Sequence, residues 1–349
     1  MKGIIFFAEE EIVLVLVERG VNRTVVVRQL LSQKYCGMRM GEFENPTELG
    51  NIFSELITAS GVKFDKVFIA TPSYLCEVTA DEIAIDLKGK KVTQAHMEQL
   101  LNSVGLSEGD NIVISKTAVY FKVDNGSACI NPIGQAGSAL IAKISLISVP
   151  HSFVDVIKSE MVTIVPSVEF VPVTLATALH LIPSSSRDSM CVLINNEQYS
   201  TTVSVVAGDG IIKSTNVDMG SYHVANDLCV VKKIDKPIAI ELLRHVVLGL
   251  VGEKAYDFSG RQFPTEETNA IISSRIEVIA EGVLKAINQS DQNLLDGEIF
   301  LMGEINAIRG ARNLLSKELG SNIVPLKCPR LNVSGTLDLL IGSVAQLVL

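Results

Sequence analysis

Two stretches of this sequence lie where a tight turn between strands could hold a phosphate group, residues 6–11 (FFAEEE) and residues 194–199 (INNEQY). A phosphate-binding turn needs small residues, so that backbone N–H groups can approach the oxygens, and an Asp nearby to organise Mg²⁺. Neither stretch contains Gly or Asp. Unless they point to solvent, Glu9, Glu10 and Glu11 would also repel a triphosphate, by about 4 kcal/mol per charge pair at ~4 Å. We therefore predict that neither turn binds phosphate.

Other residue types that commonly perform catalysis or bind metals are spread along the chain. The histidines show no metal-ligand spacing on a shared helix face, so each is interpreted as a surface or hydrogen-bonded side chain. They are His96, His151, His180, His223 and His245. The run at residues 184–186 (SSS) lies in a polar linker, and no GxSxG motif is present. The six cysteines form no CxxC pair, which indicates buried, reduced thiols. We predict no catalytic residue and no metal site.

The composition is typical of a large cytoplasmic protein that does not bind nucleic acid. The chain has 349 residues, of which 47% are hydrophobic and 20% are charged, which suits a large core divided into two lobes. Its formal net charge is −9, whereas nucleic-acid binding needs clustered Lys and Arg. We expect no signal peptide, because the start lacks a basic segment and a cleavage site. No segment approaches the ~20 apolar residues of a transmembrane helix.

The pattern of the first half predicts the element order βββαβ followed by further helices. Residues 12–17 are an uninterrupted apolar run, as in a strand covered on both faces, and residues 24–27 resume it after a turn. Residues 46–59 carry apolar residues on one side of a helix, and residues 66–70 form the next buried strand. A helix, a strand and a helix are then predicted at 153–161, 163–165 and 172–182.

A separate α+β pattern interrupts this half between residues 72 and 149. Strands are predicted at 77–87, 112–123 and 138–149, around a helix for which Thr93 is the N-cap. The polar residues 183–188 are then predicted to form a hinge between two lobes.

The opening pattern repeats after this hinge. Strands are predicted at 190–194, 201–206 and 211–217, and the turn 207–210 (AGDG) is a strong hairpin signal. Helices are predicted at 221–231, 237–251, 266–288, 306–319 and 334–347, with strands at 298–302 and 322–325. Two copies of βββαβα joined by a hinge are the ground plan of the α/β, two-lobed actin-like ATPase fold, which is ribonuclease-H-like.

Several segments match, in order, the motifs of one family with this fold. They are the loop 131–134 (NPIG) with the strand 142–147, the helix start 92–98, Gly220 with residues 224–228, Glu241 with Arg244 and His245, and the turn 302–310. Together they resemble FtsA, the bacterial actin homologue that ties the division ring to the membrane, including its inserted subdomain. The resemblance implies nucleotide-binding roles for Gly220, Glu241, Arg244, Gly303 and Gly310.

The same resemblance shows where this chain departs from the family. The first strand of FtsA carries Asp-x-Gly, but this chain has Ile5, Phe6 and Phe7 there. The second turn of FtsA carries Asp-x-Gly-Gly-Gly-Thr, and this chain has residues 194–199. Glu304 replaces the second glycine of the adenosine turn. Each change removes backbone access or adds bulk or negative charge. We expect ATP hydrolysis to be lost, and we disfavour binding of ATP with Mg²⁺.

The resemblance also implies a division into domains. The first lobe is expected at 1–71 and 150–185 with a C-terminal helix at 331–349, the inserted FtsA-type subdomain at 72–149, the second lobe at 186–234 and 273–330, and its small subdomain at 235–272.

Three functions are compatible with this sequence. The first is an FtsA-like cell-division scaffold that self-associates as a dimer or short filament and contacts an FtsZ-like or other division protein. The second is an ATP-binding actin-like protein that polymerises and links the FtsZ ring to the membrane. The third is a pilus- or microcompartment-associated actin relative, against which the insertion after Ala70 argues. The apolar residues 341–349 are interpreted as a packed helix, so membrane contact at the division site would be indirect or through a tail outside this chain.

Overall fold

The protein forms two compact units in a computed structural model, which describes residues 1–8, 10–39, 41–105, 107–249, 255–326, 328 and 336–349. The first unit is Met1–Ser189 with Val206–Ser214 and Lys327–Leu349. The second unit is Met190–Val205 with Thr215–Leu326. Each unit has a five-stranded sheet at its core, and the second sheet gives the tip of one hairpin to the first unit.

The sheet of the first unit is built from strands that are buried on both faces. In spatial order it contains β3 (Val25–Lys34), β2 (Glu11–Arg19), β1 (Lys2–Ala8), β6 (Val67–Thr71) and β11 (Val168–Pro172). β2 is antiparallel to both β3 and β1, whereas β6 and β11 run parallel to β1. The successive residues Ile4 and Ile5 are both 0% exposed, which explains why these strands have continuous apolar sequences. A small hairpin, β4 (Met38–Arg39) and β5 (Glu42–Phe43), follows β3.

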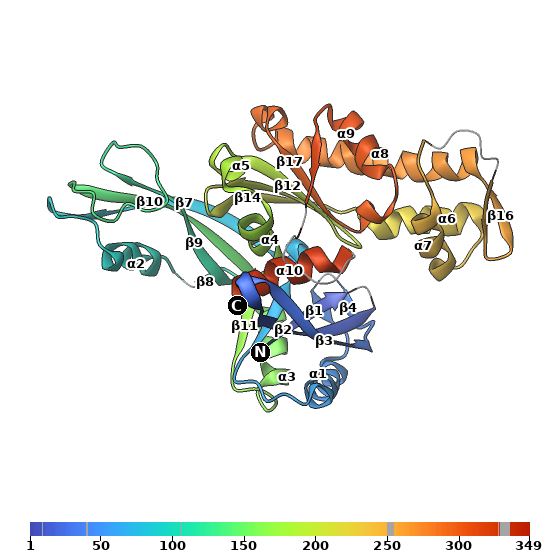
Figure 1. The fold of residues 1–349 in the computed structure, drawn as a ribbon, viewed down its shortest axis with the longest axis horizontal. Coiled ribbons are helices and arrows are strands. Elements are labelled where there is room, and N and C mark those ends of the chain that lie inside the picture. Colours follow the sequence, from blue (N-terminus) through green and yellow to red (C-terminus); the bar gives the residue numbers. More distant parts are fainter. Residues whose placement is uncertain (9, 40, 106, 250–254, 327, 329–335) are drawn as a thin grey trace. The chain divides into compact units, whose positions relative to one another are not determined.

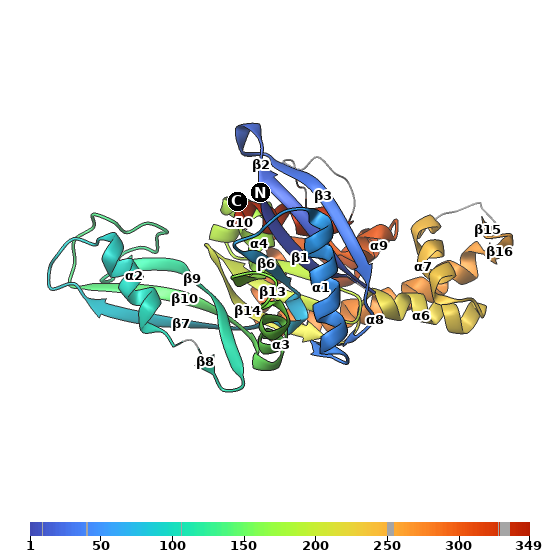
Figure 2. The same cartoon turned by 90° about the horizontal axis from the view of Figure 1, so that it is seen from below.

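Helices cover both faces of this sheet (Figure 2). The pairs that pack together are α1 (Pro46–Ser60) with α3 (His151–Met161), and α4 (Val173–Leu181) with α10 (Thr336–Val348). Side chains of Ile5, Leu14 and Ile69 share one core cluster with α1 and α3. α1 begins as a capped helix should, because the Asn45 side chain accepts the N–H of Glu48 at 3.3 Å.

An α+β subdomain lies between β6 and α3, as the sequence predicts (Figure 1). Its sheet contains, in spatial order, β7 (Glu77–Asp86), β10 (Ala139–Pro150), β9 (Asn111–Val123) and β8 (Ser107–Glu108), all antiparallel to their neighbours. The helix α2 (Gln94–Ser103) packs on one face, over Leu140, Ala142 and Ile144 of β10, each 0% exposed. Thr93 precedes α2, as predicted, and its N–H is accepted by the ring of His96 at 3.2 Å.

The second sheet repeats the topology of the first. In spatial order it contains β14 (Gly210–Val217), β13 (Thr201–Ala207), β12 (Cys191–Asn196), β17 (Ile299–Gly303) and β18 (Ile323–Pro325). As in the first sheet, three strands consecutive in the sequence, β12, β13 and β14, lie side by side. The later strands β17 and β18 then add in parallel beside β12. This repeat confirms the predicted duplication of βββαβα.

The helices of the second unit pack in a chain of contacts that centres on α8 (Thr265–Asn288). The others are α6 (Ser221–Lys232), α7 (Lys236–His245) and α9 (Ala311–Leu319), and a hairpin of β15 (Ala255–Phe258) and β16 (Arg261–Pro264) precedes α8. The guanidinium of Arg275 on α8 donates to both carboxylate oxygens of Asp227 on α6, at 2.7 and 2.9 Å. This bidentate bond raises the pKa of Arg275, so the pair stays charged and ties the two helices together.

Some predicted elements are placed wrongly. Residues 163–165 form no strand, because the N–H groups of Ile164 and Val165 bond back to the carbonyl of Met161 and wind the chain off α3. The strand that pairs with β6 is β11 instead.

Two predicted helices of the second unit are shorter than the sequence pattern indicates. The helix predicted at 237–251 ends at His245, because Val247 pairs with Arg309 from a distant part of the chain. The helix predicted at 306–319 begins only at Ala311. Residues 250–251 of the first prediction, and residues 331–335 of the predicted C-terminal helix, lie outside the described residues.

The tip of the β13–β14 hairpin is held in the first unit by a buried arginine. The predicted hinge contains a one-turn helix, α5 (Ser184–Asp188), which carries Arg187. The Arg187 guanidinium donates to the carbonyl of Gly208 at 2.7 Å and to the carboxylate of Asp209. The carbonyl of Arg187 accepts the Gly208 N–H at 3.0 Å, and Asp209 donates its N–H to Val119 on β9. The Arg187 side chain is only 10% exposed, so this tip is anchored to α5 and to the inserted subdomain.

We expect Arg187→Ala to lower the free energy of unfolding by about 2–4 kcal/mol, because the substitution leaves the Asp209 carboxylate and the Gly208 carbonyl without their buried donor. Arg28→Ala is the matched control, since it removes an exposed pair with Glu18 from the same unit and should cost much less. Urea denaturation followed by circular dichroism measures both losses, and equal losses would contradict the anchoring role.

Candidate functional site

The second of the two turns singled out in the sequence lies at the end of β12, inside the second unit. Asn195 and Asn196, the last residues of this strand, are each 1% exposed. The side-chain amide of Asn196 donates to the hydroxyl of Thr201 at 2.8 Å, and its side-chain oxygen accepts the N–H of Ile305 at 3.2 Å. Through these two hydrogen bonds, the buried Asn196 side chain joins the turn to the start of β13 and to the segment that follows β17.

The start of α6 is bonded to the same turn through the backbone. Ser221 and Tyr222 donate their N–H groups to the carbonyls of Glu197 and Gln198, at 3.1 and 2.9 Å. The free N–H groups of a helix N-terminus are the donors that would bind a phosphate. At the start of α6, two of these N–H groups already donate to carbonyls of the 195–200 turn. A phosphate in this turn would need the same N–H groups.

Gly220 and His223 complete this arrangement. The N–H of Gly220 is accepted by the ring Nδ1 of His223 at 3.1 Å, so His223 caps the helix from its third position. A Cβ at Gly220 would lie 2.1 Å from the carbonyl oxygen of Glu197. The glycine is therefore required by the close contact between helix start and turn, which is a structural reason independent of any nucleotide.

Gly303 and Glu304 form the third side of the site, where β17 ends. Gly303 has φ 101°, and a Cβ there would lie 1.9 Å from the carbonyl oxygen of Asn196. The carboxylate of Glu304 accepts a hydrogen bond from the hydroxyl of Ser221, the first residue of α6. The turn 195–200, the start of α6 and the turn after β17 thus meet at one place.

Aromatic rings add bulk beside the start of α6. The ring centroids of Tyr199 and Tyr222 are 5.0 Å apart, and the His223 ring meets Tyr222 edge-on at 5.7 Å. The Lys236 ammonium lies 5.0 Å from the centre of the Tyr222 ring.

The remaining predicted site residues lie in a second cluster of the same unit. Glu241 and Arg244 on α7 are an exposed pair, with 2.8 Å between carboxylate and guanidinium. Gly310 is preceded by Arg309, whose guanidinium donates to the carbonyl of His245 at 2.8 Å. The structure thus brings Gly220 and Gly303 together around the turn and places Gly310 beside the end of α7. No contact tests the nucleotide-binding roles of these residues, which stay predictions.

The other turn singled out in the sequence joins β1 and β2 in the first unit. Ala8 pairs with Glu11, and the carbonyl of Glu10 accepts the N–H of Tyr35 at 2.7 Å. Glu10 and Glu11 are exposed, as expected if they point to solvent, and Glu9 lies outside the described residues.

The sequence prediction missed several residues that build this site. A sequence signal exists for Asn196, because it is a polar residue at the end of an apolar strand, but no pattern indicates that its partner is Ile305, 109 positions away. His223 could have been found as the third residue of a helix that starts after Gly220. Asn306 begins a helix in the sequence prediction, but it lies before α9, and its side-chain amide donates to the carbonyl of Gly303 at 3.3 Å and closes that turn.

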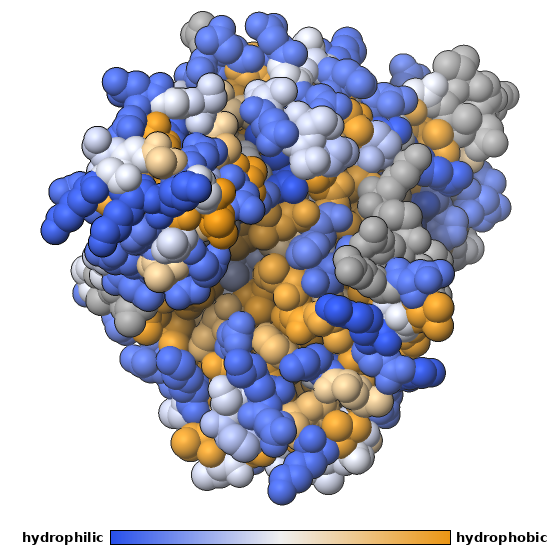
Figure 3. Space-filling view, turned by 60° about the vertical axis from the view of Figure 1, so that its left-hand side comes forward, coloured by the Kyte–Doolittle hydropathy of each residue, from blue (hydrophilic) through white to orange (hydrophobic). Residues whose placement is uncertain are grey.

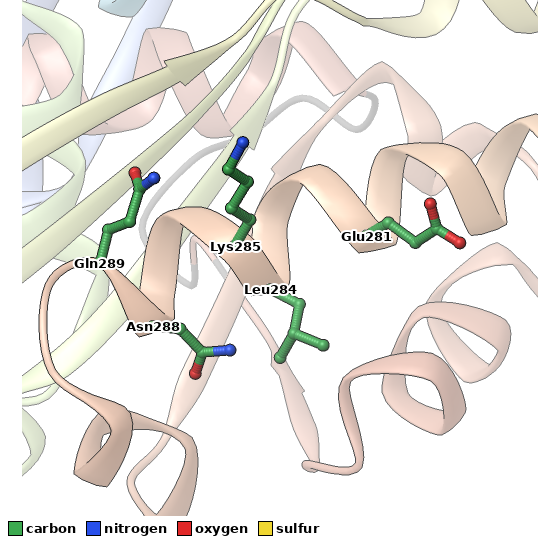
Figure 4. A pocket seen from close by; sticks show the side chains of 5 residues that line it. All are labelled: Glu281, Leu284, Lys285, Asn288 and Gln289. Carbon is green, nitrogen blue, oxygen red and sulfur yellow. The ribbon is translucent and has the colours of Figure 1, made fainter.

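Elsewhere, one open hollow runs along α8 (Figure 4). It is lined by Glu281, Leu284, Lys285, Asn288 and Gln289, and Leu284 and Asn288 point to the side opposite Lys285 and Gln289. Since a single helix supplies its lining, the hollow does not enclose a ligand. Among the described residues no group of three His, Cys, Asp or Glu side chains could hold a metal ion.

Comparison with known proteins defines the class of fold. No protein-family model matches the chain, and no curated protein matches it either. Among solved structures, a chain of the PilM–PilN type IV pilus biogenesis complex aligns with a TM-score of 0.67 and 13% identity, covering 99% of this chain and 97% of that one.

Two further solved structures agree with this likeness. The ethanolamine utilization protein EutJ from Carboxydothermus hydrogenoformans has a TM-score of 0.56 at 13% identity, over 99% of this chain and 89% of that one. MreB5 of Spiroplasma citri bound to ADP has 0.56 at 10% identity, over 99% and 95%. The chain therefore has the predicted actin-like ATPase fold, and the likeness concerns the fold alone.

The close contact at Gly303 can be measured directly. We expect Gly303→Ala to lower the free energy of unfolding by roughly 3 kcal/mol or more, because the new Cβ overlaps the Asn196 carbonyl at a left-handed backbone position. Gly320→Ala is the matched control: its φ is 64°, yet nothing lies within 4 Å of a Cβ there. That variant should lose only the backbone term of ~1 kcal/mol. Similar losses in chemical denaturation would show that the contact is not tight.

Proposed function

We propose that this protein is an actin-like scaffold that works through protein contacts and does not bind a nucleotide tightly. The observation that carries this proposal is the internal closure of the second turn. The N–H groups of Ser221 and Tyr222 bond to turn carbonyls, at 3.1 and 2.9 Å, where a phosphate would need them. An entering phosphate would have to break these bonds and would meet the carboxylate of Glu304.

The first turn supports the same proposal. It lacks both the glycine and the aspartate with which the resembling family holds phosphate and Mg²⁺, and two exposed carboxylates, Glu10 and Glu11, flank it. We therefore propose that neither ATP nor Mg²⁺ is a resident ligand and that ATP hydrolysis is not the activity of this chain.

If the chain does not bind and hydrolyse ATP, we propose that it acts by binding other proteins. Apolar residues show between the hydrophilic ones on the surface seen in Figure 3. Val230 and Val231 at the end of α6 are 69% and 52% exposed, and Ile130 and Ile133 in the inserted subdomain are 44% and 49% exposed. Within the described residues, no helix combines the length and apolar character needed to cross a bilayer.

Two classes of partner fit the proposal. The resemblance to FtsA favours an FtsZ-like division protein at the membrane face of the division site. The solved PilM–PilN chain, at a TM-score of 0.67 against 0.56 for MreB5, favours a pilus-assembly protein. We therefore propose both kinds of partner equally. The insertion after Ala70 does not argue against the pilus role, because the PilM–PilN chain aligns with 99% of this chain.

We expect isothermal titration of the full chain with ATP and Mg²⁺ to give no binding heat at nucleotide concentrations up to about 1 mM, since the expected affinity is weaker than a Kd of that order. MreB5 of Spiroplasma citri, whose solved structure holds ADP, is the positive control. Binding in the low micromolar range would overturn the proposal and favour an ATP-dependent filament.

The partner is tested separately with purified proteins from the same cell. We expect either the FtsZ-like protein or a PilN-like protein to bind with a micromolar Kd, equally well with and without ATP, because the scaffold needs no nucleotide to fold. Fluorescence anisotropy measures the affinity, and sedimentation velocity measures self-association. A chain that stays monomeric and binds neither partner would contradict the scaffold role.

A further inference from the structure

We propose that the carboxylate of Glu304 is a built-in anion, which takes the place of a bound phosphate at the start of α6 and fastens this helix to the turn after β17. The inference rests on the proposed function and deepens it, because it explains how the second unit keeps its shape without a nucleotide.

The charge pattern of α6 is the first argument. This helix has 12 residues, and its first turn contains no acidic residue. A helix of this length carries a partial positive charge of about half a unit at its N-terminus, which favours an anion there. The hydroxyl of Ser221, the first residue of the helix, donates to Glu304, a residue 83 positions further along the chain. The first turn of α6 thus receives its negative charge from Glu304, in the segment that follows β17.

The backbone around Glu304 is fixed on both sides, which is the second argument. Before it, Gly303 adopts φ 101° against the Asn196 carbonyl. After it, the N–H of Ile305 is bonded to the Asn196 side chain at 3.2 Å, and the Asn306 amide bonds back to the Gly303 carbonyl. Because the backbone is already ordered, little further entropy is lost when the carboxylate is aimed at α6.

The surrounding donors complete the argument. The N–H groups of Ser221 and Tyr222 are occupied by carbonyls of the turn, so the Ser221 hydroxyl is the group at this helix start that turns toward an anion. A carboxylate that accepts from a hydroxyl on a helix N-terminus makes the kind of charge-assisted bond that a phosphate oxygen would make. The protein therefore carries its own ligand at the place where the three segments meet.

A double-mutant cycle tests the fastening. We expect Glu304→Gln and Ser221→Ala each to lower Tm by roughly 3–6 °C, and the double variant to lose no more than the larger single loss. Glu304→Gln removes the negative charge from the bond and Ser221→Ala removes its donor, so both act on the same interaction. Glu266→Gln is the matched control, because Glu266 is an exposed carboxylate in the first turn of α8. It should shift Tm by about 1 °C or less, as a generic helix-dipole effect would. Because the chain has no Trp, tyrosine fluorescence reports unfolding alongside circular dichroism.

A second measurement tests the role as a substitute for phosphate. In Glu304→Gly, which removes the carboxylate, we expect millimolar pyrophosphate to recover at least half of the lost Tm, while the unaltered chain and Glu266→Gln do not respond. Glu304→Gln keeps the bulk of the side chain and should recover less.

The outcomes separate this inference from the proposed function. Additive Tm losses in the cycle, or no recovery of Glu304→Gly by pyrophosphate, would overturn the built-in anion even if the unaltered chain binds no ATP. Binding of ATP by the unaltered chain would overturn the proposed function, whatever the cycle shows.

Discussion

The backbone hydrogen bonds between the 195–200 turn and the first residues of α6 determine what the second unit can hold. In a helix N-terminus that binds an anion, the free N–H groups point at the ligand. In this protein they point at the carbonyls of Glu197 and Gln198, so turn and helix satisfy one another. The same contact requires glycine at position 220 and leaves the Ser221 hydroxyl to meet Glu304. One set of contacts thus joins the turn, the helix start and the segment after β17.

Most of the fold could be predicted from local patterns, because strands covered on both faces have continuous apolar sequences and hairpins have strong turn signals. The runs that became β1, β2 and β12 are of this kind, and so is the turn before β14. One failure lies where a distant residue decides. The helix expected through residue 251 ends at His245 because Val247 pairs with Arg309, and no local pattern indicates such a partner.

The candidate site was harder to predict than the fold. The absence of Gly and Asp from the turn at residues 194–199 is visible in the sequence. The replacement contacts are not visible, because Asn196 reaches Ile305 and Ser221 reaches Glu304 across long stretches of chain. Gly303 shows the same limit: a family motif suggests a ligand, whereas the structure gives it a packing reason in the nearby carbonyl of Asn196.

The anchored hairpin has a mechanical consequence. β13 passes from the second compact unit into the first between Val205 and Val206, and β14 returns between Ser214 and Thr215. The covalent connection there is a two-stranded ribbon, cross-linked by its own ladder, instead of one freely swivelling linker. Twisting a ribbon strains every rung, so torque applied to its Arg187-anchored end would be felt along its length. The tip of this hairpin therefore moves with α5 and β9, and a displacement of that end is passed along both strands at once.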